Sequence, residues 1–227
     1  MRVAVIPALD EAGCIGEVVR DLAPHVDEVV VVDNGSADDT AAVAARHGAV
    51  VELEPRRGYG AACLAGVARA RELGASVVLF LDADGSDDPA DAPRLLAEVD
   101  GGADLALGVR TRATTEPGAM TGTQRFGNWF APLMMRLAVG ARYQDMPPFK
   151  AITREALDSL ALTDTGHGFT VELLLRAHRK GLRVVELPVR CRARRAGESK
   201  VSGTLRGTVR AAGKILVMVA RHALRPA

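Results

Sequence analysis

Aromatic residues are scarce in this chain. Phe, Trp and Tyr make up 4% of its 227 residues, whereas 48% are hydrophobic and Ala, Val and Leu dominate. Such small and branched side chains suit helices packed closely on a parallel sheet better than an aromatic-lined sandwich. A single domain of this size buries roughly 70 to 75% of the surface that its unfolded chain exposes. We therefore expect a soluble α/β protein with a large aliphatic core.

Cysteine is also scarce, and long apolar runs are missing. Cys14, Cys63 and Cys191 are odd in number, widely spaced and without nearby zinc ligands, which predicts reduced thiols in the cytoplasm. The first apolar run ends at Pro7, too early for a signal peptide. The late run 215–220 is far shorter than the roughly 20 residues needed to cross a bilayer. We expect a chain that does not span a membrane by itself.

Charge of either sign is almost balanced overall but unevenly distributed. The net charge is +1, yet the residues after position 189 carry ten lysines and arginines against one acid, Glu198, so this tail is +9 and the remainder −8. An acidic body with a basic tail favours a metal–phosphate site together with an anionic surface or partner. Because no aromatic residues are interleaved in the basic run, we expect no nucleic-acid partner.

Short apolar runs predict strands at residues 3–6, 28–32, 49–53, 77–81, 104–107 and 184–187. Helices are predicted at residues 15–22, 36–46, 60–72, 92–99, 128–138 and 169–180, and from about residue 204. Ser36 is the expected cap of the second helix. The alternation up to about residue 110 is typical of a doubly wound fold, and no low-complexity linker follows it. We therefore expect one domain, residues 1–227.

Acidic turns follow three of the predicted strands. Asp82 and Asp84 stand one residue apart in a glycine-containing turn, and Asp10-Glu11 and Asp33 follow two other strands. Because the carboxyl ends of parallel strands meet at one edge of a sheet, where ligands bind, we expect these side chains to line one pocket. Paired carboxylates are hard ligands that suit Mg²⁺ or Mn²⁺.

The simpler interpretation of each acidic residue is a helix cap or an Asx turn. For Asp82 and Asp84 this interpretation is weakened, because Asp87, Asp88 and Asp91 crowd the same helix start with more carboxylates than one cap requires. The segment RRGYGAACLAG has Gly58 and Gly60 but lacks the third glycine of a dinucleotide fingerprint, and it follows the third strand. Its glycines indicate close approach of backbone to ligand and of helix to sheet, not NAD binding.

Five segments together resemble the family 2 glycosyltransferases of GT-A fold, in particular the dolichyl or polyprenyl phosphate mannosyl- and glucosyltransferases. They are VIPALDEAGCIGEVV, VVDNGSADDT, RGYGAACLAGV, LFLDADGSDDP and RRAGESKVSGT, in the same order over nearly the whole chain. The resemblance implies a mostly parallel central sheet with helices on both faces. It also implies a nucleotide-sugar half, residues 1–110, and an acceptor half, residues 111–227, that ends in a basic helix.

The resemblance places functional residues on this sequence. The nucleotide-sugar residues would be Pro7, Ala8, Asp10, Glu11, Asp33, Gly58, Asp82, Ala83 and Asp84. Asp82 and Asp84 would hold Mg²⁺ or Mn²⁺, with Ser86 where relatives often carry a glutamine ligand. Arg110, Arg125, Ser199 and Lys200 would bind the acceptor phosphate, and Asp84, Asp145, Arg194 and Lys200 would be catalytic. The segment Pro147-Pro148-Phe149-Lys150 departs from the family's S-G-F-R pattern.

The implied reaction is the transfer of a hexose from GDP-mannose or UDP-glucose, both of which fit Asp33, to a polyprenyl phosphate with inversion at C1. The cation, Arg194 and Lys200 would stabilise the leaving diphosphate. A lipid phosphate is already anionic and needs little help from a base, whereas for a soluble hydroxyl acceptor Asp145 would be the general base. Helical Glu172 is interpreted as a hydrogen-bonded structural residue, and His167 as a weak substrate-contact candidate.

Two other functions remain open at this point. The stretch FLDADGS also mimics the nucleophile motif of haloacid-dehalogenase phosphohydrolases, although about 80 residues precede it here. A non-catalytic binding module is the second alternative. The basic helix with Arg206, Arg210 and Lys214 fits either peripheral contact with an anionic membrane, at the inner face of the cell membrane, or a terminal helix packed on the protein. A homo-oligomer is compatible with the sequence.

Overall fold

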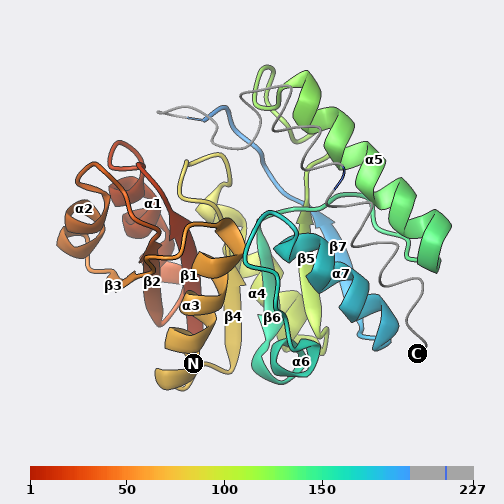
Figure 1. Ribbon diagram of the computed structural model, residues 1–227, viewed down its shortest axis with the longest axis horizontal. Coiled ribbons are helices and arrows are strands. Elements are labelled where there is room, and N and C mark those ends of the chain that lie inside the picture. The colour runs from red at the N-terminus through yellow and green to blue at the C-terminus, as the bar shows by residue number, and fades with distance from the viewer. Residues whose placement is uncertain (195–212, 214–227) are drawn as a thin grey trace.

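The computed structural model describes residues 1–194 and Gly213, and seven strands in this part of the chain form one mixed sheet (Figure 1). The strands are β1 (Arg2–Ala8), β2 (Glu28–Asp33), β3 (Val50–Leu53), β4 (Val77–Phe80), β5 (Leu105–Val109), β6 (Lys150–Thr153) and β7 (Val184–Pro188). Their order is β3-β2-β1-β4-β6-β5-β7. Only β6, among these described strands, runs antiparallel to its neighbours β4 and β5. The prediction of a mostly parallel sheet is confirmed.

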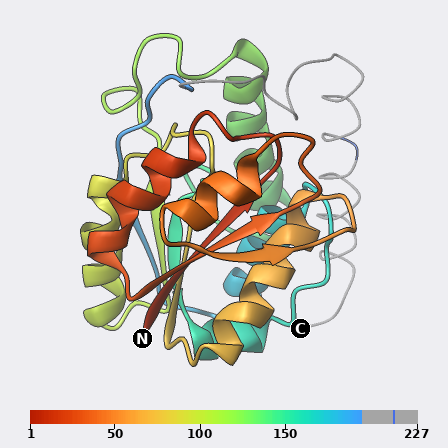
Figure 2. The same cartoon turned by 90° about the vertical axis from the view of Figure 1, so that its left-hand side faces the viewer.

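Helices cover both faces of the sheet, because side chains alternate along each strand. The helices are α1 (Ile15–Leu22), α2 (Thr40–Arg46), α3 (Tyr59–Glu72), α4 (Ala92–Asp100), α5 (Gly122–Val139), α6 (Arg154–Leu160) and α7 (Phe169–Arg179). On β1, Ala4 and Ile6 pack in the cluster that contains α1 and α4, whereas Val3 and Val5 pack in the cluster with α3, α6 and α7. Figure 2, seen from the β3 edge, shows α1 and α3 on opposite sides.

The start of α2 differs from the prediction. The helix begins at Thr40, and Ser36 does not cap it: the Ser36 hydroxyl oxygen accepts from the Asp10 amide at 2.9 Å, while the Ser36 hydroxyl and amide donate to the Asp33 carboxylate. A cap would need the Ser36 oxygen to accept from an amide of the first helical turn, and here that oxygen accepts from the Asp10 amide. The Asp38 carboxylate accepts a hydrogen bond from the Thr40 amide at 3.0 Å and so occupies the helix start.

Residues beyond Arg110 contain more regular structure than the sequence predicts. Strand β6 and helix α6 were not expected, and α5 begins at Gly122 instead of residue 128. The early start of α5 is explained by a capping box, in which Thr121 accepts from the Gln124 amide and Gln124 accepts from the Thr121 amide. Within the described residues no helix is both long and apolar enough to span a membrane. The basic helix expected from residue 204 lies outside the described residues.

Candidate functional site

A cavity of about 430 Å³ opens where β1, β2 and β4 end, at the predicted edge of the sheet. Cavities of this volume are typical of small-molecule sites. The lining residues are Pro7, Ala8, Leu9, Glu11, Asn34, Arg57, Gly58, Tyr59, Ala62, Asp82, Ala83, Asp84, Gln124, His167 and Arg194. The predicted site residues among them are Pro7, Ala8, Glu11, Gly58, Asp82, Ala83, Asp84 and Arg194. Residues from opposite ends of the sequence therefore meet in one pocket.

Asp82 and Asp84 place two carboxylates in this pocket. The Asp84 Oδ1 atom accepts from the Ser86 amide at 2.9 Å, which is one Asx-turn contact, while Oδ2 faces Arg194. Burial raises the pKa of the Asp82 carboxyl to about 6, the Asp84 carboxylate adds to the rise, and the positive charge of Lys150 opposes it. The pair is a concentration of negative charge that a cation would relieve.

The helix-cap interpretation of the acidic turn applies to other residues. The short 3-10 turn η2 (Pro89–Asp91) is capped by Asp88, whose carboxylate accepts from the Ala90 amide at 3.2 Å. Asp91 receives the Arg190 amide at 2.8 Å and pairs with Arg94. Asp82 and Asp84 are thus not needed as caps and remain directed at the pocket.

Arg194 joins two of the acidic turns. One guanidinium nitrogen donates to Glu11 Oε1 at 2.9 Å, and another lies 3.1 Å from Asp84 Oδ2. Both carboxylates are largely shielded, with side chains 7% and 14% exposed, so these ion pairs are stronger than surface pairs. The segment arrives there because Arg192 donates its amide to the Ser86 carbonyl at 2.8 Å, and Cys191 bridges to Asp87. The basic segment therefore lies over the acidic edge of the sheet as far as Arg194.

Gly58 and Gly60 allow the closest backbone approach in the pocket wall. Gly58 has φ = +144°, and a Cβ there would lie 2.2 Å from the Thr165 carbonyl oxygen. A Cβ on Gly60 would lie 2.1 Å from the Asp164 carbonyl oxygen. The Gly60 amide donates to the Gly166 carbonyl at 3.1 Å. The two glycines therefore admit the backbone of residues 164–166, and Gly58 also lines the cavity.

The loop of residues 163–168 places His167 in the pocket lining. Glu172 on α7 fixes this loop through hydrogen bonds. This carboxylate accepts from the amides of Thr163 at 2.9 Å and Asp164 at 2.7 Å, and it pairs with Arg176. Glu172 is 3% exposed. The interpretation of Glu172 as a buried, hydrogen-bonded residue is confirmed, and His167 lines the cavity.

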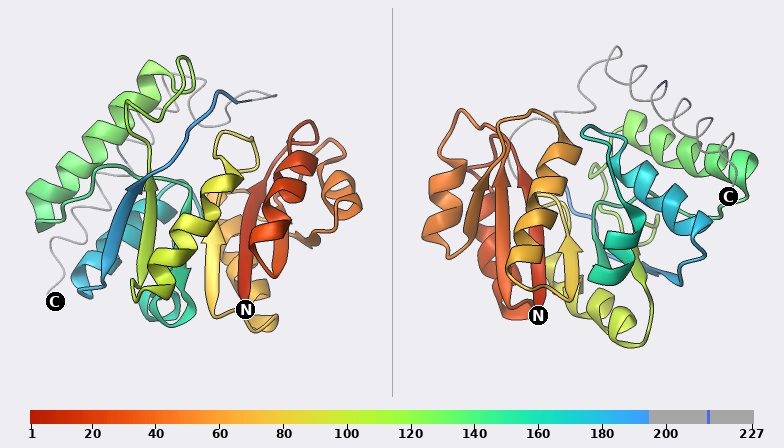
Figure 3. Two further views of the ribbon diagram at one scale, coloured as in Figure 1. Left: turned by 180° about the vertical axis from the view of Figure 1, so that it is seen from behind. Right: turned by 60° about the horizontal axis from the view of Figure 1, so that its bottom comes forward.

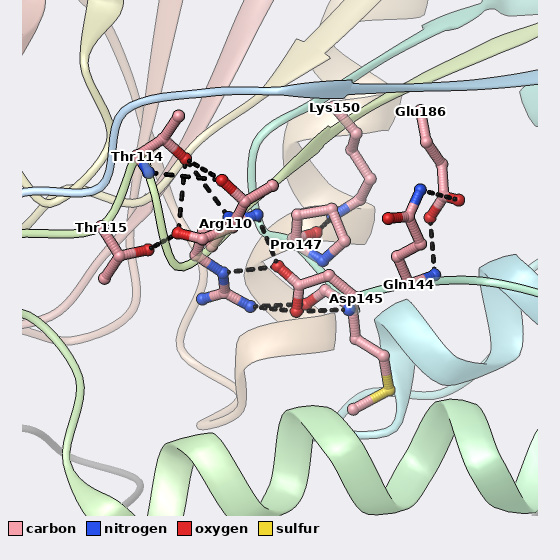
Figure 4. Close-up of polar contacts among 10 residues, drawn as sticks. Arg110, Thr114, Thr115, Gln144, Asp145, Pro147, Lys150 and Glu186 are labelled. Carbon is pink, nitrogen blue, oxygen red and sulfur yellow. Dashed lines mark hydrogen bonds and ion pairs between the residues drawn. The ribbon is translucent and has the colours of Figure 1, made fainter.

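Arg110 and Asp145 form a shielded pair (Figure 4), and the Arg110 charge acts on Asp82 in the acidic turn. Arg110 Nε donates to Asp145 Oδ2 at 2.8 Å and Nη2 to Oδ1 at 2.9 Å. The Met146 amide also donates to Oδ1 at 2.7 Å. Both oxygens of Asp145 are thus engaged, so the structure favours a positioning role for this residue, and its role as a general base stays a prediction.

The unusual Pro147-Pro148 turn is held by Lys150. Its ammonium donates to the carbonyls of Pro147 at 3.2 Å and Pro148 at 3.0 Å (Figure 4). The ammonium also lies 5.4 Å from the centre of the Phe80 ring. Lys150 is fully buried, and burial lowers its pKa. Proline has no backbone N–H to donate, but its carbonyl oxygen still accepts hydrogen bonds. The lysine therefore stabilises the loop that presents Asp145.

Other predicted site residues stand apart from the cavity lining. Asp33 binds the amide and hydroxyl of Ser36, and Asp10 accepts from the Ala37 amide at 2.7 Å. Both therefore shape the turn beside the pocket. Arg125 is exposed on α5. Ser199 and Lys200 lie outside the described residues, so their roles stay predictions.

Several pocket residues were missed by the sequence reasoning. Asn34 donates to the carbonyls of Glu54 and Arg56 and accepts from the Gly58 amide at 2.7 Å, which fixes the loop that leads into α3. Its place after Asp33 at a strand end is a signal that could have identified it. Gln124 could have been found from the T-x-x-Q capping box. Leu9, Arg57, Tyr59 and Ala62 carry no comparable signal.

The chain matches known proteins over most of its length. Residues 3–166 match the family model described as Glycosyl transferase family 2. An uncharacterised glycosyltransferase of Mycobacterium tuberculosis is 44% identical over 208 residues, which cover 90% of this chain and 91% of the relative. An undecaprenyl-phosphate mannosyltransferase of Micrococcus luteus is 34% identical over 199 residues, which cover 83% and 81%.

The fold also matches a solved enzyme structure. The glucosyl-3-phosphoglycerate synthase of Mycobacterium tuberculosis, crystallised with Mn²⁺, UDP and glucosyl-3-phosphoglycerate, superposes with a TM-score of 0.77. The alignment covers all of this chain and 81% of the synthase at 24% sequence identity, so it bears on the fold alone. The family match confirms the expected resemblance and leaves the phosphohydrolase alternative without support. The chain belongs to glycosyl transferase family 2, and it is a glycosyltransferase with a GT-A-like α/β fold.

Proposed function

We propose that this glycosyltransferase transfers a hexose from GDP-mannose or UDP-glucose to a polyprenyl phosphate, with the aid of a divalent cation and with inversion at C1. The observation that carries the proposal is the meeting of Glu11, Asp84 and Arg194 in a cavity of about 430 Å³. This pocket combines acidic groups for a cation with a basic group for a diphosphate. A nucleotide sugar carries the diphosphate that both groups require.

The donor set of the pocket fits Mg²⁺ or Mn²⁺. Asp82 and Asp84 supply carboxylate oxygens, and the pKa of Asp82 is raised first by burial and then by the neighbouring Asp84 carboxylate, whose repulsion a cation would relieve. No group of three or more His, Cys, Asp or Glu side chains that could hold a metal ion occurs among the described residues. When bound, the cation would neutralise negative charge that develops on the leaving diphosphate. Solved structures of glucosyl-3-phosphoglycerate synthase with Mn²⁺ or Mg²⁺ and UDP support this proposal at the level of the fold.

The acceptor is proposed to be a lipid phosphate because of the state of Asp145. A hydroxyl acceptor requires a base, but both oxygens of Asp145 are bound by Arg110 and Met146. A phosphate monoester is already anionic and requires cations nearby instead. Arg110, Arg125, Ser199 and Lys200 are the proposed acceptor-side residues. The relative from Micrococcus luteus, named an undecaprenyl-phosphate mannosyltransferase, supports this class of acceptor.

The proposed step is a single displacement. A phosphate oxygen of the acceptor forms a bond to C1 of the sugar while the bond from C1 to the diphosphate oxygen breaks, and the electron pair leaves with the nucleoside diphosphate. Arg194, held by Glu11 and Asp84, would donate to the departing diphosphate, as would Lys200. Asp145 would keep Arg110 oriented toward the acidic turn. The enzyme would act in the cytoplasm, in peripheral contact with the anionic inner face of the cell membrane.

A panel of nucleotide sugars tests the proposal. The full chain is mixed with GDP-mannose, UDP-glucose or other nucleotide sugars and with Mg²⁺ or Mn²⁺, and thermal stabilisation is recorded. Transfer to polyprenyl phosphate and to soluble hydroxyl acceptors is then measured. We expect metal-dependent stabilisation by one donor and transfer to the lipid phosphate. Transfer only to soluble hydroxyls would overturn the acceptor assignment, and no response to any nucleotide sugar would overturn the donor assignment.

The matched variants are Asp82→Asn and Asp39→Asn. Both exchange a carboxylate for an amide, but Asp82 lines the pocket whereas Asp39 is exposed beside α2. We expect Asp82→Asn to abolish metal-dependent transfer and Asp39→Asn to leave it unchanged. Equal activity of the two variants would contradict a role of Asp82 in the reaction.

A further inference from the structure

Helix α5 exposes an unusual number of large apolar side chains. Phe126, Trp129 and Leu137 are 52%, 60% and 71% exposed, whereas the protein as a whole has few aromatic residues. Phe126 stacks on Phe130 with ring centres 5.5 Å apart and lies 5.9 Å from Trp129. Exposed apolar patches of contiguous side chains mark interaction surfaces. The helix lies at the end of the molecule opposite β3 (Figures 1 and 3).

The exposed residues form one face of the helix. Phe126, Trp129, Phe130, Leu133 and Leu137 recur at spacings of three and four residues and therefore share one side. The opposite side is formed by Ala131 and Met135, which are fully buried. The inward face of α5 is therefore already used for packing. The outward face, called here the α5 apolar face, consists of the five residues named first.

Charge on α5 indicates the kind of partner. Arg125 and Arg136 are exposed and stand eleven residues apart, about three turns, so they lie on the same side and border the α5 apolar face. The helix contains no Asp or Glu. Two copies paired through this face would bring these arginines into one small interface, whereas an anionic bilayer would attract them. Helices with aromatic and leucine side chains bordered by basic residues lie in membrane interfaces.

The position of α5 relative to the pocket strengthens this argument. Gln124 in the first turn of α5 lines the cavity, and the exposed Arg125 and Phe126 follow it directly. A lipid acceptor held in a bilayer against the α5 apolar face would thus have its phosphate beside the pocket. A soluble substrate would give no reason for an apolar face at this place.

We infer that the α5 apolar face docks onto an anionic lipid bilayer and that it delivers the lipid acceptor to the cavity. This inference rests on the proposed function, because it assigns a surface to the lipid class proposed there. Phe126, Trp129 and Leu137 insert into the boundary between headgroups and acyl chains. Arg125 and Arg136 contact anionic headgroups.

Trp129 is the single tryptophan of the chain, so its fluorescence reports directly on this face. The full chain is titrated with vesicles of phosphatidylglycerol and, separately, of phosphatidylcholine. We expect phosphatidylglycerol vesicles to shift the Trp129 emission to shorter wavelength and to shield it from a water-soluble quencher. Phosphatidylcholine vesicles should have a much weaker effect, and added salt should weaken the response.

The matched variants are Leu137→Asp and Leu53→Asp. Both leucines are highly exposed, at 71% and 67%, but Leu53 lies on β3 at the opposite end of the molecule. Leu137→Asp should weaken binding to phosphatidylglycerol vesicles by roughly tenfold or more, and Leu53→Asp should not. Phe126→Ser serves as a second variant, and nucleotide-dependent thermal stabilisation verifies that each variant is folded. Equal vesicle binding by Leu137→Asp and Leu53→Asp would refute the inference.

The other occupants of the face give distinct results, each of which overturns the inference. A Trp129 emission that depends on protein concentration without lipid indicates a second copy of the chain. A short-wavelength emission that neither lipid nor dilution changes indicates cover by another part of the same chain. Vesicle binding without any change at Trp129 places the membrane contact elsewhere.

The reaction itself is tested separately with a short-chain, water-soluble polyprenyl phosphate. Leu137→Asp should retain transfer to this acceptor and lose transfer to the same headgroup embedded in vesicles. If wild-type transfer to the short acceptor occurs but vesicles have no effect on Trp129, only the docking inference fails. If no polyprenyl phosphate of either kind is a substrate, the proposed function fails.

Discussion

Individual residues of this site act mostly through the charges that they neutralise. Arg194 contacts Glu11 and Asp84, and Arg110 contacts Asp145, so each arginine is paired with a shielded carboxylate. Removing one member of such a pair leaves the other charge without compensation, which costs more than the pair contributes. Substitutions at these positions therefore test the electrostatic description of the pocket.

Arg194→Ala should lower the rate of transfer by about a hundredfold, because a donor to the developing charge of the diphosphate is lost. It should also strengthen binding of Mn²⁺ in the absence of nucleotide, because the guanidinium no longer competes for Asp84. Steady-state kinetics and a metal titration measure both effects. Arg20→Ala is the control, since Arg20 is 62% exposed on α1. Unchanged kinetics in Arg194→Ala would exclude the assigned role.

Asp145→Asn should destabilise the fold by on the order of 3 kcal/mol, because it leaves the Arg110 guanidinium shielded and unbalanced. The free energy of unfolding is measured with urea. Asp21→Asn, at an exposed ion pair, should change it by less than about 0.5 kcal/mol. If Asp145→Asn instead retains full stability and loses an ionisation from the pH–rate profile, Asp145 is a base and not a positioning residue.

At the scale of elements, the pocket wall depends on how closely α3 approaches the loop of residues 163–168. The amides of Gly60 and Ala61 donate to the carbonyls of Gly166 and Thr165. This contact leaves no room for a side chain at Gly58 or Gly60. The same loop is fixed by Glu172 from α7, so two helices and one loop set the place of His167.

Gly60→Ala should destabilise the protein by about 1–3 kcal/mol and weaken donor binding, because the new Cβ would lie 2.1 Å from a backbone oxygen. Gly127→Ala in α5 is the matched control, since nothing lies within 4 Å of its added Cβ. That exchange should be neutral or stabilising by up to about 1 kcal/mol. Thermal unfolding with and without nucleotide measures both. If Gly60→Ala changes neither stability nor donor binding, the loop of residues 163–168 can move away from α3 at little cost in free energy.

For the whole molecule, the acidic edge of the sheet links stability to pH and to the cation. Burial raises the pKa of Asp82 to about 6 and that of Asp87 to about 8, above the ordinary value of 3.8. A carboxyl whose pKa is raised by folding stabilises the folded state below its unfolded pKa, and this contribution is lost as the pH rises through the folded pKa. The metal-free protein should therefore lose stability between about pH 4 and pH 8 at this site.

The corresponding measurement is a series of melting temperatures from about pH 5 to pH 8 with a chelator or with Mn²⁺. We expect Mn²⁺ to restore stability most at the alkaline end, where the carboxylates are ionised and metal binding favours the folded state. Asp87→Asn remains neutral, so its metal-free stability should fall less with pH than that of the wild type. If the melting temperature of the metal-free wild type rises over this pH range relative to that of Asp87→Asn, the predicted loss of stability with increasing pH is wrong.

Secondary structure was predicted more accurately from the sequence before residue 110 than after it. The strands up to residue 110 are runs of branched side chains bounded by turns, and the helix Ile15–Leu22 was predicted without error. Strand β6 was missed because it has four residues, lies beside a helix and pairs with β4 and β5, which are far away in sequence. The Ser36 cap was wrong because the Ser36 hydroxyl oxygen accepts from the amide of Asp10, which lies 26 positions earlier in the chain.

The order of residues alone determined the α/β class, the acidic edge of the sheet and the family, because strand periodicity and strand-end carboxylates are local features. Tertiary structure alone decided which of these groups meet. Glu11 contacts Arg194 across 183 positions, Arg110 occupies both oxygens of Asp145, and α5 turns its aromatic residues outward. Such contacts depend on sheet order and helix orientation, because residues distant in sequence become neighbours only when the strands have paired and the core has packed.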